Sequence, residues 1–462
     1  MRPKTRRPTG PAPGRLRSAI AAAVLGGALF ALGCGTPPKA PQRVIVILID
    51  ALRADHVGLD GSTLGATPSI DRLGPDSIWF ERAFAQASWT RPSVPSLLTG
   101  LYPSEHGLVD FVESGREVTG AALAEEVTTL AEGMHAAGYR TALVGYQSQL
   151  SPKFGTAQGF DFYNNNTRTP DRIQSRFFEW VDEAPDRPFF AYLHYLDIHW
   201  PYCPPEETFG RFYSGPSQLD LCADWRGLRE RLRSGETVLD AEDRKLLAAR
   251  YTEELAALDQ ALGLLFDELE RRGMMDETLI VLTADHGEEL YERGGIEHGH
   301  TMHEELLRVP YIWKLPRSWS AARGEPSDAL VEIRSTLPTL FDLAGQPLPP
   351  EVSAPSLVPW LAGHPPKPSP VDAVFAEANG MFSARTDRWK LIATPAQDRY
   401  ELYDLGEDPA ERHDLAAERP EELAEMKRLL RRWKAGLHPV RSEAAVLDQE
   451  TTEDLKALGY IQ

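Results

Sequence analysis

Apolar residues along the chain fall into short continuous runs that are separated by longer amphipathic stretches. Runs rich in β-branched and aromatic residues predict strands at Val44–Ile49, Phe189–Leu196, Leu279–Thr283 and Thr141–Gly145. Continuous apolar runs of this length are typical of strands that are covered on both faces. These segments therefore predict the buried centre of a sheet.

Apolar positions with helical spacing lie between and after these strands. Residues 127–138, 241–272 and 335–345 have this spacing, and each stretch ends at or next to a glycine. Glycine is a common helix stop because it adopts the left-handed conformation without strain. The alternation of strands and helices predicts an α/β fold with a mainly parallel sheet that helices cover on both faces.

The hydrophobic pattern changes after residue 345. Residues 346–370 are rich in proline and predict a linker. Short apolar runs then predict a small α+β subdomain over residues 371–435, with strands at Val374–Ala376, Arg388–Ile392 and Tyr400–Asp404 and a helix at Glu421–Lys434. Residues 436–462 predict only a tail with a modest helix near its end. Residues 43–345 are then the main domain.

The first 34 residues differ from the rest of the chain. A basic stretch without acidic residues precedes the apolar run Ser18–Leu32, which is followed by Gly33 and Cys34. This arrangement predicts a bacterial export signal, and its end resembles a lipoprotein signal in which Cys34 becomes the lipidated N-terminus. An uncleaved N-terminal anchor is the alternative. With residues 35–42 as a proline-rich tether, we expect an exported protein of the periplasm or outer surface that reaches the membrane only through its lipid anchor.

Composition narrows the possible partners. The chain of 462 residues has 49 basic and 68 acidic side chains, a net charge of −19, which argues against a nucleic-acid-binding surface. Beyond the leader, Cys203 and Cys222 both lie in a polar insertion that runs to about residue 237. In an exported protein we expect a local disulfide between them. Two unrelated thiols or a metal-binding pair are the alternatives.

Polar side chains follow two of the predicted strands. Asp50 comes directly after Val44–Ile49, and Asp285 and His286 come shortly after Leu279–Thr283. Open α/β sheets keep their ligands at this edge. Thr90 precedes a predicted helix N-terminus, a place suited to an anion. Two carboxylates, an imidazole and a hydroxyl suit one divalent ion. Such an ion would lower the pKa of the Thr90 hydroxyl. Each residue alone, however, could be a simple helix cap.

Several ordered motifs resemble the sulfatase family of the alkaline phosphatase superfamily. They are I-D-A-L-R-A-D-H (49–56), P-S-V-P-S-L-L-T-G-L-Y-P (92–103), D-I-H-W-P-Y (197–202), T-A-D-H-G-E (283–288), H-G-H-T-M-H-E-E-L-L-R-V-P (298–310), T-L-P-T-L-F-D-L-A-G (336–345) and E-L-Y-D-L-G-E-D-P (401–409). The resemblance spans about residues 43–435. It implies a hydrolase of anionic esters with a large mixed sheet between helices, and a small C-terminal subdomain around a four-stranded antiparallel sheet.

The resemblance also shows where this chain departs from the family. It implies metal ligands at Asp50, Asp285 and His286, but the second aspartate that sulfatases usually carry is replaced by Ala51. The catalytic position of the C/S-x-P-S-R pattern falls on Thr90, and the arginine of that pattern is absent. Sulfatases oxidise Cys or Ser at this position to formylglycine. Threonine would give a ketone instead, so we expect no formylglycine.

Threonine at the catalytic position is similar to superfamily relatives that act on phosphorus, the nucleotide pyrophosphatase-like phosphodiesterases and the phosphoethanolamine transferases. In these relatives an unmodified threonine forms a phospho-enzyme. The resemblance therefore implies one divalent ion held by Asp50, Thr90, Asp285 and His286, with zinc favoured over calcium or manganese, and a phosphate or phosphonate ester as substrate. A sulfatase that acts without formylglycine is a second hypothesis, and an inactive module that binds a glycan or another anion is a third.

Three further residues are candidates for contact with the substrate. His199 and His300 match positions at which relatives bind the substrate, and we expect both to contact the anion and to protonate the leaving group. Hydrogen bonding to loop backbone is the alternative for both. Arg91, beside Thr90, either clamps the anion or faces solvent. The sequence does not distinguish a small anionic ester from one carried on a glycan or a lipid head group.

Overall fold

The computed structural model describes residues 40–114, 117–217, 219–319, 323–440 and 442–458. The predicted export signal over residues 1–34 and the predicted lipidation site Cys34 lie outside the described residues. No helix in the described ranges combines the length and the apolar character that a membrane span requires.

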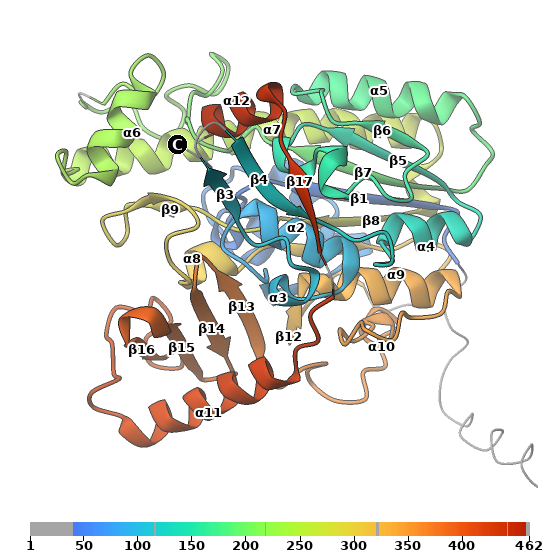
Figure 1. Cartoon of the computed structure of the whole chain (residues 1–462). Coiled ribbons are helices and arrows are strands. Elements are labelled where there is room, and N and C mark those ends of the chain that lie inside the picture. Colours follow the sequence, from blue (N-terminus) through green and yellow to red (C-terminus); the bar gives the residue numbers. More distant parts are fainter. Residues whose placement is uncertain (1–39, 115–116, 218, 320–322, 441, 459–462) are drawn as a thin grey trace, which may run out of the picture. The chain divides into compact units, whose positions relative to one another are not determined.

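An eight-stranded mixed sheet forms the centre of the main domain (Figure 1). Its order is β12 (Glu325–Glu332), β2 (Ser77–Phe84), β11 (Tyr311–Lys314), β8 (Thr278–Thr283), β1 (Arg43–Ile49), β7 (Phe189–Tyr195), β5 (Arg140–Gly145) and β6 (Phe162–Asn164). All strand pairs are parallel except those of β11 with β8 and β2. The predicted strands are therefore the neighbouring central strands β1, β5, β7 and β8.

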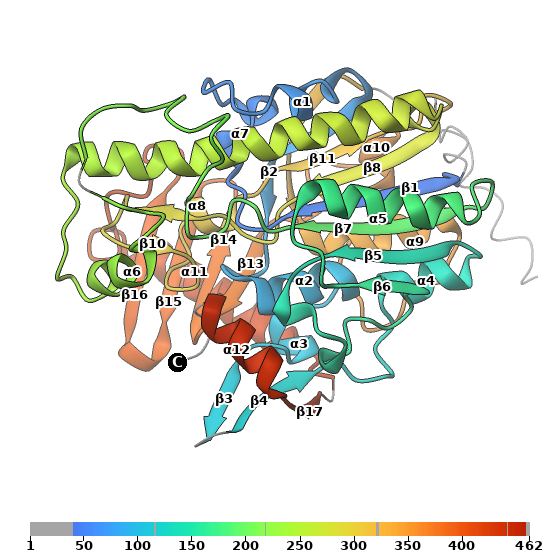
Figure 2. The ribbon, with the colours of Figure 1, turned by 90° about the horizontal axis from the view of Figure 1, so that it is seen from above.

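Helices cover both faces of this sheet (Figures 1 and 2). The helices α5 (Pro170–Asp182) and α7 (Ala241–Arg271) lie on one face, and α2 (Thr90–Thr99), α4 (Leu130–Ala136) and α9 (Thr336–Ala344) lie on the other. Residues 44–49 of β1 are fully buried, as expected for a strand covered from both sides. The fold expected from the sequence, a large mixed sheet between helices, is confirmed.

A second sheet of four antiparallel strands follows in the chain. It consists of β13 (Val374–Ala378), β14 (Met381–Arg385), β15 (Trp389–Thr394) and β16 (Arg399–Asp404), and α11 (Pro420–Gly436) packs against β14 and β15. The four-stranded sheet implied by the resemblance is present. The hydrophobic pattern alone missed β14, because its buried half consists of Ser383, Ala384 and Arg385 and therefore carries a weak apolar signal.

An ion cluster is buried between this second sheet and α8 (Glu304–Leu307). Lys390 of β15 lies 2.9 Å from a carboxylate oxygen of Glu304 and 2.7 Å from one of Glu411. His303 Nδ1 donates to the other oxygen of Glu411 at 3.0 Å. Lys390 is fully buried and Glu411 is 1% exposed, so these charges neutralise one another away from water.

The chain after α11 differs from the prediction of a tail with a single helix. Residues Glu443–Val446 form β17, which pairs with β4 (Glu117–Ala122), and β3 (Phe111–Ser114) pairs with the other edge of β4. The helix α12 (Gln449–Leu458) follows. The prediction missed β17 because four residues with two alanines give almost no strand signal, and pairing with a strand that is distant in sequence supplies what local propensity lacks.

The remaining helices and strands are short, and one lies in the polar insertion. They are α1 (Pro68–Asp71), α3 (Pro103–His106), α6 (Trp225–Arg233), β9 (Glu289–Leu290), β10 (Ile296–Glu297) and α10 (Val358–Leu361). The insertion was predicted to be irregular, yet it contains α6. Before α6, a disulfide joins Cys203 to Cys222, with the two Cα atoms 5.2 Å apart.

Candidate active site

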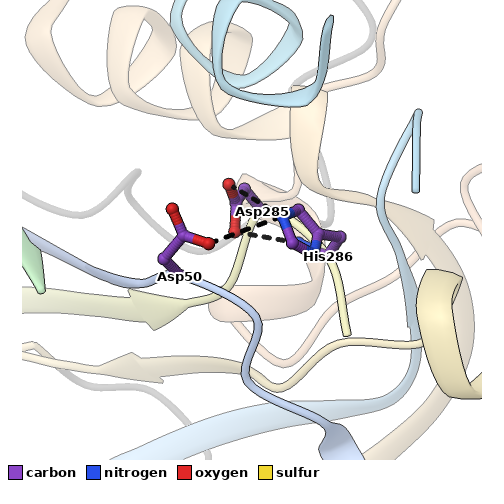
Figure 3. A group of neighbouring side chains, drawn as sticks. All are labelled: Asp50, Asp285 and His286. Carbon is purple, nitrogen blue, oxygen red and sulfur yellow. Dashed lines mark hydrogen bonds and ion pairs between the residues drawn. The ribbon is translucent and has the colours of Figure 1, made fainter. Parts of the chain in front are cut away.

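The carboxyl ends of β1 and β8 bring three ligand-type side chains together. The two strands are parallel neighbours with Leu48 opposite Thr283, so Asp50 and Asp285 each lie two residues beyond this pair. His286 follows directly. One ligand atom from each of the three side chains lies within 4.8 Å of the others, and all three side chains are fully buried (Figure 3). The sheet register therefore creates the cluster that the sequence predicted.

The chemistry of this cluster fits a divalent cation. Asp50 Oδ1 and Asp285 Oδ2 have no hydrogen-bond partner among the described residues, and each lies 3.5 Å from His286 Nε2. His286 Nδ1 lies 2.8 Å from the Gly287 carbonyl oxygen and must donate to it, because a carbonyl only accepts. The neutral ring then presents its Nε2 lone pair to the two carboxylates. Two carboxylate oxygens and one imidazole nitrogen can hold a divalent metal ion, and the histidine is oriented by its hydrogen bond to backbone.

Electrostatics in the cluster favour an added positive charge. Burial and the charge of Asp50 hold the pKa of Asp285 well above its usual value. Burial opposes ionisation of Asp50 as well, but the hydrogen bond from His194 and the nearby His286 outweigh it, and the pKa of Asp50 is lowered. One carboxylate is thus ionised while its neighbour resists ionisation. A bound cation would stabilise both charges.

Thr90 lies beside this cluster at the first position of α2. Its Oγ1 donates to Asp50 Oδ2 at 3.3 Å and lies 3.2 Å from His286 Nε2. The preceding residue, Trp89, is extended, so the chain enters the helix at the hydroxyl as the sequence indicated. The N-terminus of this ten-residue helix adds a positive dipole end at the same place.

Sequence reasoning missed two residues that hold Asp50. Gln147 Nε2 donates to Asp50 Oδ2 at 2.7 Å, and His194 Nε2 lies 3.3 Å from the same oxygen. Both are fully buried. The sequence contained a signal for each of them. His194 is the one imidazole in β7, whose other residues are apolar or aromatic. Gln147 follows β5 at the ligand-binding edge of the sheet.

Ala51 takes the place of the second family aspartate and contributes only backbone. Its φ of 61° is left-handed, which is unusual for alanine. Its N–H lies 3.3 Å from Asp285 Oδ1, and its carbonyl accepts a hydrogen bond from Tyr251 at 2.8 Å. The ligand set is therefore one carboxylate smaller than the family pattern, as the sequence predicted.

His199, the first candidate for contact with the substrate, is connected to the cluster through a neighbouring ring. Its Nδ1 donates to the Trp200 carbonyl oxygen at 2.9 Å, and burial lowers its pKa although the charge of Asp50 opposes this. Its ring contacts that of His298, which in turn contacts His286, with ring centroids 5.0 and 4.2 Å apart. His199 therefore lies close to the cluster, and its burial favours the neutral form of the ring.

His300, the second candidate for contact with the substrate, has a pKa that is shifted upward, opposite to that of His199. Its Nε2 lies 2.6 Å from a carboxylate oxygen of Glu289. Burial alone would lower its pKa, but the hydrogen bond and charge of Glu289 outweigh burial and raise it. Compared with a free imidazole, His199 therefore favours its neutral form more strongly, and His300 favours its protonated form more strongly.

Arg91 lies elsewhere than the sequence suggested. It is 1% exposed, its Nε donates to the Asp110 carbonyl oxygen at 3.2 Å, and its Nη2 donates to the Ala121 carbonyl oxygen at 2.6 Å. The guanidinium lies over the rings of Phe111 and Phe154, 4.0 and 4.5 Å from their centroids. Both expectations for Arg91 are corrected: its guanidinium does not face solvent, and its hydrogen bonds within the described residues go to backbone carbonyls of the β3–β4 region rather than to the cluster.

Two family models match long parts of this chain. A family model described as "Sulfatase" matches residues 42–346, and one described as "N-sulphoglucosamine sulphohydrolase, C-terminal" matches residues 296–436. The human N-sulphoglucosamine sulphohydrolase is 27% identical over 333 residues, which are 67% of this chain and 62% of that protein. An arylsulfatase of Clostridium perfringens is 21% identical over 443 residues, 81% of this chain and 90% of that protein.

A similar fold occurs among solved structures. The phosphonate monoester hydrolase of Agrobacterium radiobacter is 22% identical, with a TM-score of 0.70 over 86% of this chain and 95% of that one. The corresponding enzyme of Silicibacter pomeroyi is 21% identical, with a TM-score of 0.71 over 85% of this chain and 95% of that one. At these identities the likeness establishes the fold alone.

Proposed function

The chain belongs to the sulfatase family, a family of ester hydrolases, and from this premise we propose that it hydrolyses a phosphate or phosphonate ester with Thr90 as the nucleophile. The observation that supports this most directly is the position of Thr90 Oγ1, within 3.3 Å of Asp50 Oδ2 and 3.2 Å of His286 Nε2. A hydroxyl at a helix N-terminus beside a cation-type cluster is placed to attack an anionic ester.

The proposed cofactor is one divalent ion held by Asp50, Thr90, Asp285 and His286, with zinc favoured because the set includes an imidazole and lacks the oxygen-rich shell of a calcium site. Such an ion supplies charge neutralisation for the ester and a lower pKa for the Thr90 hydroxyl. We propose that Thr90 stays unmodified, since oxidation of a secondary alcohol cannot give the aldehyde that formylglycine chemistry requires.

The proposed reaction has two displacements at phosphorus. In the first, the Thr90 hydroxyl gives its proton to water and its oxygen forms a bond to phosphorus. The bond from phosphorus to the leaving oxygen breaks, and the leaving oxygen takes a proton. In the second, water attacks phosphorus, the bond to Thr90 breaks, and the threonine oxygen regains a proton. We propose that His300, whose pKa is raised, donates a proton to the leaving oxygen and that His199, whose pKa is lowered, accepts one from water.

The competing substrate is a sulfate ester, which the names of the curated relatives favour. Turnover of nitrophenyl phosphonate, bis-nitrophenyl phosphate and nitrophenyl sulfate by the metal-loaded protein separates the two. We expect the phosphorus esters to be the better substrates. If kcat/KM is highest for nitrophenyl sulfate, the substrate is a sulfate ester and the proposed phosphorus ester is wrong.

The nucleophile is tested by Thr90→Ala and Thr90→Ser. We expect the alanine variant to lose at least about 1000-fold in kcat and the serine variant to retain part of the activity, because only serine keeps the hydroxyl. Intact-mass measurement after rapid acid quench should show a phosphoryl adduct on the wild-type protein and none on Thr90→Ala. Wild-type turnover by Thr90→Ala would refute the assignment.

We also propose that the chain is exported and lipid-anchored through Cys34. The disulfide between Cys203 and Cys222 supports an oxidising compartment. Mass spectrometry of the N-terminal peptide from a membrane fraction tests this, with Cys34→Ala as the control. An unlipidated peptide beginning before Cys34 would contradict the anchor.

A further inference from the structure

The helix α6 of the polar insertion is joined to the short strand β10 through one buried carboxylate (Figure 2). Arg229 Nε donates to Glu297 Oε2 at 2.8 Å, and Arg229 Nη2 lies 2.5 Å from the other oxygen of that carboxylate. Arg233, one turn further along α6, places its Nη2 2.9 Å from Glu297 Oε2. Since Glu297 is 1% exposed, loss of both arginines would leave a buried charge without these partners, which is costly.

Glu297 lies where the chain turns toward the candidate active site. Its φ of 68° is left-handed, a conformation that a glutamate keeps only where its surroundings hold it. The next residue, His298, contacts His286 with ring centroids 4.2 Å apart, and His298 Nδ1 lies 3.1 Å from Glu288 Oε1. The ion pairs of Glu297 therefore act on the backbone directly before a side chain that contacts the proposed metal ligand His286.

Residues 298–300, which include the proposed proton donor His300, also contact other parts of the fold. Asn379, between β13 and β14, donates from its Nδ2 to the Gly299 carbonyl oxygen at 2.7 Å. His300 Nε2 lies 2.6 Å from a carboxylate oxygen of Glu289 in β9, the strand that pairs with β10. The start of this segment is thus held by α6, and its middle and end by two other elements.

The helix α6 is packed independently of these ion pairs. Leu228 and Leu232 on this helix are 2% and 5% exposed and belong to the main hydrophobic core. The disulfide of Cys222 with Cys203 ties the chain three residues before α6. Removal of the two guanidinium groups should therefore leave the helix in place and change mainly the contacts of Glu297.

We propose that Arg229 and Arg233 are positioning residues, which act through Glu297 to fix residues 298–300 so that His300 can protonate the leaving oxygen. Neither arginine touches the substrate in this role. The proposal rests on the proposed hydrolase function and gives the polar insertion a part in the reaction. A purely stabilising role of the ion pairs is the alternative, and it predicts different kinetics.

Hydrogen exchange followed by mass spectrometry of the full-length protein tests the positioning without turnover. In an Arg229→Ala/Arg233→Ala double variant, backbone amides of residues 295–303 should exchange about tenfold faster or more, because local opening no longer breaks these ion pairs. Arg231→Ala is the matched control, since Arg231 lies on α6 but pairs with Asp224 at 2.7 Å, and it should exchange like the wild type. Equal exchange in the double variant and the wild type would overturn the proposal.

Kinetics with two leaving groups separate positioning from stabilisation. Phenolate is a stronger base than nitrophenolate, so its departure depends more on protonation by an acid. In the double variant, kcat/KM for the phenyl monoester of methylphosphonic acid should fall about tenfold or more further than kcat/KM for the nitrophenyl monoester. Metal content should stay unchanged, and Arg231→Ala should keep both values. An equal fall for both esters would show that the arginines serve only the fold, and would overturn the proposal.

The outcomes distinguish this proposal from the proposed function. Wild-type protein that hydrolyses neither ester would refute the proposed function, and hydrogen exchange then decides alone whether the arginines hold residues 298–300. An active wild-type protein whose double variant keeps the wild-type ratio of the two kcat/KM values would refute the positioning role alone.

Discussion

Among the buried groups of charged side chains in the described part of the chain, two differ in how their charges are balanced. In the cluster around Lys390, the ammonium pairs with Glu304 and Glu411. In the cluster of Asp50, Asp285 and His286, two carboxylate oxygens have no hydrogen-bond partner within the described residues. The first cluster contains its own cation, Lys390, whereas the three residues of the second include no lysine or arginine and could hold an added cation.

The pKa values of Glu411 in the first cluster and Asp285 in the second illustrate the difference. Burial opposes ionisation of Glu411, but Lys390 and His303 outweigh it and lower its pKa to about 2. Burial and a like charge raise the pKa of Asp285. Buried ions that are mutually paired therefore indicate structure, and buried ions that remain uncompensated indicate a binding site.

The largest expected effect is on catalysis. Asp285→Asn should lower kcat/KM for nitrophenyl phosphonate by more than about 100-fold, because a ligand carboxylate is lost. Lys390→Met should leave kcat/KM per folded molecule unchanged. Metal content measured on both variants should fall only in Asp285→Asn. Full activity of Asp285→Asn would show that the cluster of Asp50, Asp285 and His286 does not serve catalysis.

The free energy of unfolding should fall more in Lys390→Met than in Asp285→Asn, the reverse of the order expected for catalysis. Lys390→Met leaves buried carboxylates unpaired and should cost about 3–5 kcal/mol in the free energy of unfolding. In metal-free protein, Asp285→Asn should lower the free energy of unfolding only slightly or even raise it, because it removes like-charge repulsion with Asp50. Urea unfolding of both metal-free variants measures this. A larger loss of unfolding free energy in Asp285→Asn than in Lys390→Met would contradict the distinction between the two clusters.

A smaller effect is expected at the residues that hold Asp50. Gln147→Ala should weaken metal binding about 10- to 100-fold, as is usual when a partner of a ligand is removed. Gln174→Ala is a matched control, since Gln174 donates to the Ala261 carbonyl oxygen on α7. Titration calorimetry with zinc gives both affinities. Equal affinities would show that Gln147 does not position Asp50.

The smallest effect is on acid stability. The pKa of Glu411 in the folded chain is below its usual value of 4.5. Its contribution is therefore complete above about pH 4.5 and is lost as the pH falls toward 2. Glu411→Gln should flatten the decline of the unfolding free energy over this range, measured by urea unfolding at successive pH values. An unchanged slope would place the acid sensitivity elsewhere.

The sequence predicted the centre of the fold better than its periphery. Strands β1, β5, β7 and β8 were visible because burial on both faces makes them continuously apolar. The cluster was predictable because its residues follow these strands. Gln147 and His194 were missed because their contacts with Asp50 depend on sheet register, although their positions in and after the strands β7 and β5 were a usable signal. Arg91 was misjudged because its partners are backbone carbonyls of residues distant in sequence.

The pairing of β17 with β4 has a consequence for the order of synthesis. The two strands are more than 300 residues apart, so β4 remains an open edge strand until residues 443–446 have been made. The carbonyl of Ala121 in β4 anchors Arg91, the residue after the proposed nucleophile. During translation, the surroundings of Thr90 are thus completed late, after both large sheets can already have formed.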